Sequence, residues 1–452
     1  MSNQDTIAAV ATPHGESAIA MVRVSGTACS DLTQQIFARK SPPLPRRSCH
    51  GDYRSASGEL LDDVVYCFYK GPASYSGEDT LEIMCHGNPL IATRVLQDLF
   101  KRGCRQAEPG EFTQRSFLNG RMDLTQAEAV MELIQARSDK AIRVANNQLR
   151  GAFGRQLMEL KEKLLRNVAV IEAYIDFPEE DLPAEQRQAQ IDGIQGVRTF
   201  CSRLIDSSKY AAFLRDGVKT LILGEPNAGK SSLLNCLLGF ERAIVSDEPG
   251  TTRDFLRERI ILGDHSIQLM DTAGLRVAQG AIEREGIKKT IELANEADMF
   301  LLVVDSSLPS PDFPQEILEH LTTENCIVVK NKSDLPSPVE VAAVLETFSS
   351  VSLSALNGDG LDELKTALIQ HIDAHFSNDE DELILVNARH STALGELRDC
   401  LDAALGKFEL GDEAELIASD MRGAMDAIGR ILGRIDNEDM LDVLFSSFCI
   451  GK

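Results

Sequence analysis

Hydrophobic and polar positions follow two different periods along this chain, and the period changes several times. Short apolar runs between loops rich in Gly, Pro and Ser predict strands, and the first 120 residues contain three of them: Ile19–Val24, Val64–Tyr69 and Leu81–Cys85. From Leu124 to about Tyr210 the apolar residues recur at three- and four-residue steps, which indicates helices. Only the segment DFPEEDLP interrupts this helical region.

Strands and helices then alternate from Gly217 to about Ala374, as a parallel α/β sheet requires. Helical periodicity returns after the acidic segment SNDEDE. Because helical segments flank the α/β module, we expect that module to be inserted into a single helical domain. The predicted domains are residues 1–120 (mixed α/β), 121–216 (helical, first part), 217–373 (α/β module) and 374–452 (helical, second part).

Composition adds a constraint on partners. The 452 residues carry a net charge of −24, which argues against broad binding to nucleic acid. A nucleic-acid partner therefore requires a local basic patch or a second protein.

The start MSNQDTIAAV has no basic segment and no apolar run is long enough to cross a membrane, so we expect a cytoplasmic protein. The ten cysteines are scattered singly, and for most of them we expect small buried side chains.

The strongest chemical signal is the stretch TLILGEPNAGKSSLLN, in which an apolar strand meets a glycine-rich loop and then a helix. Such a loop directs backbone N–H groups at phosphate, its lysine contacts the β- and γ-phosphates, and its first serine contacts Mg²⁺. The residues predicted to bind the triphosphate are Asn227, Ala228, Gly229, Lys230, Ser231 and Ser232.

Three later motifs complete a guanine nucleotide site. IQLMDTAGL contributes Asp271, Thr272, Ala273 and Gly274; VVKNKSD contributes Asn331, Lys332 and Asp334; VSLSAL contributes Ser354, Ala355 and Leu356. Asp334 can accept two hydrogen bonds from guanine, whereas adenine offers no matching donors, so GTP is favoured over ATP. Leu275 stands where Ras-like proteins keep a water-orienting glutamine, so this module needs another means of positioning water.

The motifs GxPNAGKSS, GTTRD, DTAGLR and FCIGK, at this spacing, closely resemble the MnmE (TrmE) family of tRNA-modification GTPases, and the resemblance covers the whole chain. It implies a Ras-like P-loop G domain inserted in a helical domain, preceded by a mixed α/β domain that binds tetrahydrofolate and dimerises. The alternative among GTPases is an Era-like factor that binds RNA or assembles ribosomes. Its basic RNA-binding domain has no counterpart in the acidic helical flanks.

The resemblance also implies roles in hydrolysis. The G domains of a homodimer would pair around K⁺, held by Asn227, Ser246, Glu248 and Thr251, while Thr252 would join Ser231 on Mg²⁺. Ser246, Thr251 and Thr252 would also contact GTP. Glu283 matches the glutamate that orients the attacking water, whereas its spacing alone favours a solvated carboxylate at a helix start.

For the N-terminal domain, the resemblance implies a 5-formyl or methylene derivative of tetrahydrofolate bound by Arg23, Glu78, Arg121 and Lys452. Arg121 stands where the family has lysine. Without the resemblance, Arg23 is simply a strand residue with a solvated head. A flavoprotein called MnmG or GidA would join the chain in a heterotetramer that modifies the wobble uridine of certain tRNAs, with no membrane involved.

Cys449 lies in the tail SSFCIGK. A prenylation box is excluded because Gly451 is not aliphatic and Lys452 is not an accepted last residue, and a cytosolic disulfide is unfavourable. A packing cysteine and a functional thiol both remain. The resemblance favours the second, because it places this tail at the folate site, where Cys449 would act as a nucleophile or an acid.

Overall fold

The computed structural model describes residues 5–176, 184–240, 257–271, 282–309, 313–336, 345–376, 384, 386–410, 414–433, 441, 444–446, 448 and 450–451. It divides into two compact units. The first comprises Met1–Met131, Gln148–Val197 and Glu396–Lys452, and the second comprises Glu132–Asn147 and Arg198–Gly395. Within the described residues, no helix is both long enough and apolar enough to cross a bilayer.

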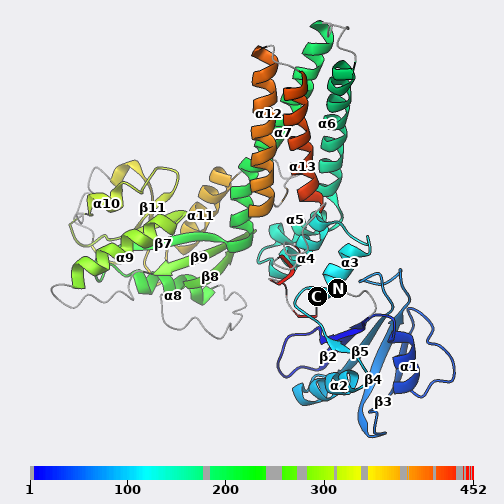
Figure 1. Cartoon of the computed structure of the whole chain (residues 1–452). Coiled ribbons are helices and arrows are strands. Elements are labelled where there is room, and N and C mark those ends of the chain that lie inside the picture. Colours follow the sequence, from blue (N-terminus) through cyan, green and yellow to red (C-terminus); the bar gives the residue numbers. More distant parts are fainter. Residues whose placement is uncertain are drawn as a thin grey trace. The chain divides into compact units, whose positions relative to one another are not determined.

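The N-terminal domain is built on a six-stranded sheet of order β3-β4-β5-β2-β1-β6 (Figure 1). Its strands are β1 (Ile7–Val10), β2 (Ile19–Ser25), β3 (Ser48–Arg54), β4 (Leu60–Tyr69), β5 (Thr80–His86) and β6 (Arg105–Gln106). Helices α1 (Cys29–Ile36) and α2 (Pro89–Lys101) pack on it through a core that includes Leu32, Ile83 and Leu99. All three predicted strands are confirmed. Strand β3 escaped prediction because its sequence SCHGDYR is polar, as suits an edge strand.

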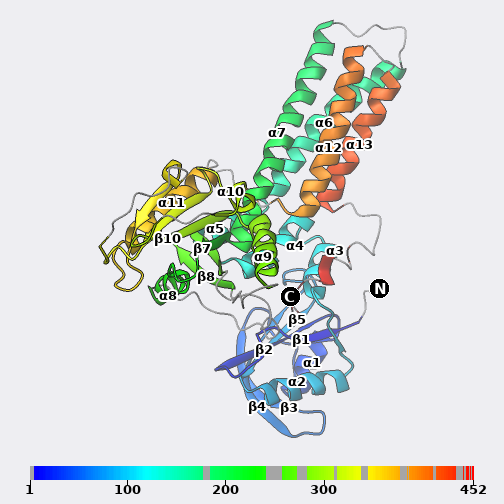
Figure 2. The same cartoon turned by 90° about the vertical axis from the view of Figure 1, so that its left-hand side faces the viewer.

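Helix α3 (Glu111–Leu118) follows β6 in the N-terminal domain. Among the described residues, the helical region contains α4 (Leu124–Gln135), α5 (Asp139–Leu149), α6 (Ala152–Asp176), α7 (Ala184–Asp216), α12 (Ala388–Leu410) and α13 (Ala414–Leu432). In the first compact unit, α6 and α13 lie beside the first part of α7 and the last part of α12 (Figure 2). Arg422 on α13 pairs with Glu172 on α6 at 3.1 Å. One bundle is therefore made of segments from both sides of the α/β module.

The α/β module has a second six-stranded sheet, of order β12-β11-β10-β7-β9-β8. Its strands are β7 (Val218–Gly224), β8 (Arg257–Leu262), β9 (His265–Asp271), β10 (Met299–Asp305), β11 (Cys326–Asn331) and β12 (Ser349–Ser352). Every neighbouring pair is parallel except β8 with β9. This is the doubly wound arrangement of a P-loop domain.

Helices cover both faces of this sheet. Helices α8 (Lys230–Phe240) and α11 (Leu361–Phe376) pack on one face, where Leu233, Ile222 and Leu364 share a core. Helices α9 (Ile282–Glu296) and α10 (Gln315–Leu318) pack on the other, together with a short 3₁₀ turn at Leu345–Thr347. Burial on both faces explains the continuous apolar run MFLLVV of β10.

Candidate functional site: a nucleotide site and an N-terminal charge network

The motifs of the α/β module follow the ends of its parallel strands. Strand β7 ends at Gly224, and the neighbouring strands end at Asp271, Asp305, Asn331 and Ser352. Because the strands are parallel, these carboxyl ends share one edge of the sheet, the edge at which such sheets bind ligands. The fold thus brings together motifs that are far apart in the sequence.

The loop after β7 has the backbone of a phosphate-binding turn. Asn227 and Gly229 have φ values of +68° and +97°, in the left-handed region. At Gly224 an added Cβ would lie 2.4 Å from the carbonyl oxygen of Val303, so the close approach of β7 to β10 requires glycine. Helix α8 begins at Lys230, and its unpaired first N–H groups therefore border this loop.

Lys230 is held inside the loop. Its Nζ donates to the carbonyl oxygens of Gly224 and Glu225 at 2.7 and 2.9 Å. Burial lowers the pKa of Lys230, while the carboxylates of Asp271 and Glu225 act in the opposite direction. A polyphosphate beside the ammonium stabilises its charged form, so the loop is electrostatically suited to an anionic ligand.

Asn331 connects the base-reading motif to the phosphate loop. Its side-chain Nδ2 donates to the carbonyl oxygen of Ala228 at 2.8 Å, and its Oδ1 accepts from the backbone N–H of Ala355 at 3.0 Å. Ser354 is buried beside it. One side chain thus ties together three of the four predicted motifs.

A residue that the sequence analysis missed, Asp305, lies at the end of β10. It accepts from Lys332 Nζ at 2.5 Å and from Ser307 Oγ at 2.6 Å. Burial acts to raise the pKa of Asp305, but these hydrogen bonds outweigh it and the pKa is lowered. The available signal was a carboxylate directly after an apolar strand, as in IQLMD.

A hollow of about 100 Å³ lies between the phosphate loop, the end of β10 with the residues after it, and Lys332 after β11. It is lined by Glu225, Pro226, Asn227, Ala228, Val303, Val304, Asp305, Leu308, Pro309 and Lys332. Asp334 is exposed, and Leu356 is 84% exposed. Both remain accessible to a ligand at this edge, and Ser231 and Ser232 in the first turn of α8 are exposed as well.

Several predicted residues lie outside the described part of the chain. They are Ser246, Glu248, Thr251, Thr252, Thr272, Ala273, Gly274, Cys449 and Lys452. Glu283 belongs to the first turn of α9, and only its backbone is described.

In the N-terminal domain, Arg23 is 9% exposed, so the expectation of a solvated head is wrong. Its guanidinium pairs with Glu82 on β5 at 3.0 Å and lies 5.4 Å from the ring centroid of Tyr75. Its Nη1 donates to the carbonyl oxygen of Gly451 at 3.2 Å. Arg23 therefore joins the sheet to the C-terminal tail.

Glu78 belongs to a neighbouring charge network. It accepts from Ser25 Oγ at 2.8 Å and from Arg115 at 3.0 Å, while Arg115 also pairs with Glu111 and Asp5 at 2.8 and 2.6 Å. Ser25 follows Arg23 by two residues on β2, so both side chains lie on one face of the sheet. Arg121 is exposed and lies near Gly77, the residue before Glu78.

The described residues of the C-terminal tail dock on the N-terminal domain. Ile450 forms a β-bridge with Pro109, and Phe448 lies against Gly110. Phe445 packs with Phe448 and with Leu124 at the start of the following helix, α4. Gly451 has a φ of +95°, and an added Cβ would lie 2.6 Å from the carbonyl oxygen of Val10. The flanks of Cys449 are thus fixed close to Arg23.

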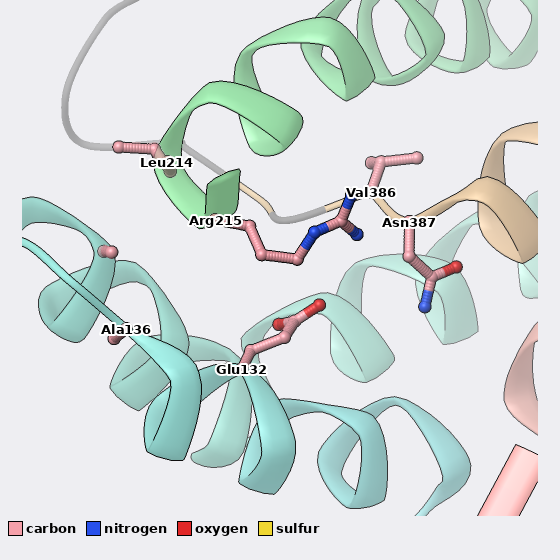
Figure 3. A pocket seen from close by; sticks show the side chains of 7 residues that line it. Glu132, Ala136, Leu214, Arg215, Val386 and Asn387 are labelled. Carbon is pink, nitrogen blue, oxygen red and sulfur yellow. The ribbon is translucent and has the colours of Figure 1, made fainter. Parts of the chain in front are cut away.

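A further cavity, of about 20 Å³, lies at the base of the α/β module in the second compact unit (Figure 3). It has room for about one water molecule. Its lining includes Arg215 at the end of α7, Asn387 just before α12, and Glu132 on α4. The pKa of Arg215 is raised, chiefly by its hydrogen bond to Asp216.

The sheet order and the left-handed loop before α8 are those of a P-loop nucleotide-binding domain. Two sequence profiles match the chain: "GTP-binding protein TrmE N-terminus" over residues 6–121 and "MnmE helical domain" over residues 124–449. The tRNA modification GTPase MnmE of Opitutus terrae is 51% identical over 450 residues, and that of Aquifex aeolicus is 42% identical over 453. These matches cover 99% of this chain, and 99% and 100% of the two relatives.

The chain belongs to the MnmE family of tRNA modification GTPases. It is therefore a GTP-hydrolysing enzyme of tRNA modification. The match over the whole length also decides against the Era-like alternative.

Of the nine cysteines that the structure describes, six are buried, which confirms the expectation that most cysteines are small buried side chains.

Proposed function

We propose that this chain is a cytoplasmic, potassium-activated GTPase that acts with a flavoprotein of the MnmG (GidA) type. The pair adds a carboxymethylaminomethyl-type group to the wobble uridine of certain tRNAs. The observation that carries this proposal is the junction of Arg23 with the docked C-terminal tail, because it brings the flanks of Cys449 to the N-terminal domain's charged site.

In the G domain, GTP lies with its phosphates on the loop from Asn227 to Ser232 and its base against Asp334. Mg²⁺ is held by Ser231 and Thr252, with Asp271 near it through water. The exposed hydroxyl of Ser231 in the first turn of α8 suits this role. Thr272, Ala273 and Gly274 face the γ-phosphate, and Ser354, Ala355 and Leu356 border the base.

K⁺ binds at Asn227, with oxygens of Ser246, Glu248 and Thr251, in a homodimer of G domains. A fixed monovalent charge there stabilises the charge that develops between the β- and γ-phosphates. Support comes from Asn227, whose left-handed backbone and exposed side chain leave its amide oxygen available. Glu283 orients the attacking water.

In the N-terminal domain, a tetrahydrofolate derivative lies against Arg23, Glu78, Arg121 and Lys452 and supplies the one-carbon unit. Arg23 and Glu78 are held rigidly by Glu82, Ser25 and Arg115, as a binding site for a defined ligand requires. Cys449 acts there as a nucleophile or an acid.

The proposal is tested by measuring GTP turnover in K⁺ and in Na⁺ at matched ionic strength, with wild-type chain and with Asn227→Ala. Fast turnover in K⁺ alone, lost in the variant while GTP still binds, supports the K⁺ site. Equal rates in the two salts would refute it. Mass spectrometry of tRNA from a deletion strain tests the second half: wobble uridines that keep their modification would exclude this function.

A further inference from the structure

The net charge of −24 leaves open how this chain approaches a polyanionic RNA. One segment departs from the acidic background. Residues 32–51 contain neither Asp nor Glu, the longest such stretch in the chain, and carry Arg39, Lys40, Arg46 and Arg47. We call residues 39–47 the basic loop. It joins α1 to β3 in the N-terminal domain.

Three cations of the basic loop are accessible. Lys40, Arg46 and Arg47 are exposed, and among the residues that the structure describes no carboxylate pairs with any of them. Other exposed basic side chains nearby have carboxylate partners: His50 lies 2.8 Å from Asp63, and Lys70 lies 2.8 Å from Asp79. The positive charge is therefore concentrated at the basic loop.

The loop is held in place, which lowers the entropy lost on binding. The backbone N–H of Arg46 donates to the carbonyl oxygen of Phe68 at 2.7 Å, and its Nη2 donates to that of Ala73 at 3.1 Å. One of the five guanidinium donors is used in this way, and the others can reach a phosphate. Arg46 is thus positioned by the protein and still able to bind an anion.

The basic loop borders an open hollow of about 430 Å³, lined by Arg46, Ser48, Cys67, Tyr69, Ala73, Ser74 and Tyr75. The ring of Tyr75 faces the guanidinium of Arg23, so the hollow adjoins the site proposed for the one-carbon unit. In the sheet, Glu82 lies opposite Cys67 of this hollow, and its charge is paired with Arg23.

We propose that the basic loop binds the phosphodiester backbone of the substrate tRNA, beside Arg23, through Lys40, Arg46 and Arg47. This inference rests on the proposed function, because it takes tRNA as the substrate. An RNA is favoured because a strongly acidic chain repels a polyanion everywhere except at such a patch. The hollow also offers the aromatic surface of Tyr69 to an unstacked base.

The test uses the full chain, alone and with its flavoprotein partner, and an unmodified tRNA transcript. Binding is measured by titration across a range of salt concentrations for wild type, Lys40→Gln/Arg47→Gln and Arg54→Gln/Arg94→Gln. The second pair is the matched control: it removes the same charge from the same domain, but Arg54 and Arg94 already pair with Asp52 and Glu59. Thermal unfolding verifies that each variant is folded.

We expect Lys40→Gln/Arg47→Gln to weaken tRNA binding at least about tenfold and to lower the salt slope by about 2, since each lost phosphate contact removes about 0.9 from it. The control pair should bind like wild type. Equal behaviour of the two pairs would overturn the inference alone. A loss of the dimer with tRNA binding intact would also overturn it, because the loop would then be a protein interface. A wild-type chain that binds no tRNA, with or without the flavoprotein, would instead refute the proposed substrate.

Discussion

The N-terminal domain and the G domain use charge in different ways. In the N-terminal domain, Arg23 and Arg115 are 9% and 7% exposed, and carboxylates already hold them in place. In the G domain, Asn227 and Asp334 are exposed at strand ends, where a nucleotide can reach them. The first arrangement builds a rigid site that depends on distant parts of the chain, and the second builds an open site from local turns.

The largest expected effect concerns the tail that completes the N-terminal site. Cys449→Ser should abolish wobble-uridine modification, measured by mass spectrometry of cellular tRNA, and leave GTP turnover near normal. The reason is that its neighbours Phe448 and Ile450 lie against Gly110 and Pro109 of the N-terminal domain. Full modification in the variant would make Cys449 a packing residue.

The next largest effect is expected on stability, from the buried ion pairs of Arg115 in the N-terminal domain. Arg115→Met should destabilise the N-terminal domain by about 3 kcal/mol, because it leaves the buried Glu111 with fewer partners. Faster hydrogen exchange in β1 and α3 would report the loss locally. Arg94→Met, which removes an exposed arginine 3.6 Å from Glu59, is the control and should change exchange little.

The same network predicts an acid dependence. The pKa of Glu111 is lowered despite burial, by hydrogen bonds from Arg105, Glu108 N–H and Arg115, and that of Asp5 is lowered likewise by Arg105 and Arg115. A lowered carboxyl pKa stabilises the folded state above the unfolded pKa of about 4, and that contribution is lost as the pH falls below it. Arg115→Met should show a smaller loss of thermal stability below about pH 4 than wild type.

In the G domain the effect should be on rate. Glu283→Ala should lower GTP turnover on the order of 10²-fold, the usual size for losing a group that assists proton transfer. GTP affinity should hardly change, since in the proposed role the carboxylate would act on water and not on the bound nucleotide. Steady-state kinetics and nucleotide titration separate the two quantities. Near-normal turnover would return Glu283 to an ordinary carboxylate at a helix start.

The smallest effect is expected for an exposed pair in the second compact unit. Arg143 on α5 lies 2.9 Å from Asp264 in the turn between β8 and β9, and their side chains are 57% and 48% exposed. Arg143→Gln should change stability by less than about 1 kcal/mol, because water screens the pair. If Arg143→Gln lowered the unfolding temperature as much as Arg115→Met does, the proposed difference in stability between buried and exposed ion pairs would be wrong.

The difference between the two regions also explains what the sequence could predict. The phosphate loop and the base motif are contiguous runs whose local geometry follows from Gly, Lys and Asp at fixed spacing, and the strands before them are buried on both faces. By contrast, the partners of Arg23 are 59 and 428 residues away, and those of Arg115 reach back to Asp5. No local pattern carries such information, so the burial of Arg23 was not foreseen.

The hydrogen bond between Arg23 and Gly451 has a consequence for the order in which the protein matures. A ribosome makes the N-terminal strands first, then both helical segments and the inserted GTPase module, and reaches Gly451 428 residues after Arg23. The core of the N-terminal domain can form early, since its sheet is complete once β6 is made. Its charged site cannot, because the tail that contacts Arg23 does not yet exist. A chain that ends after β6 but before residue 451 can complete the sheet of its first domain and still lack the contact between Arg23 and Gly451.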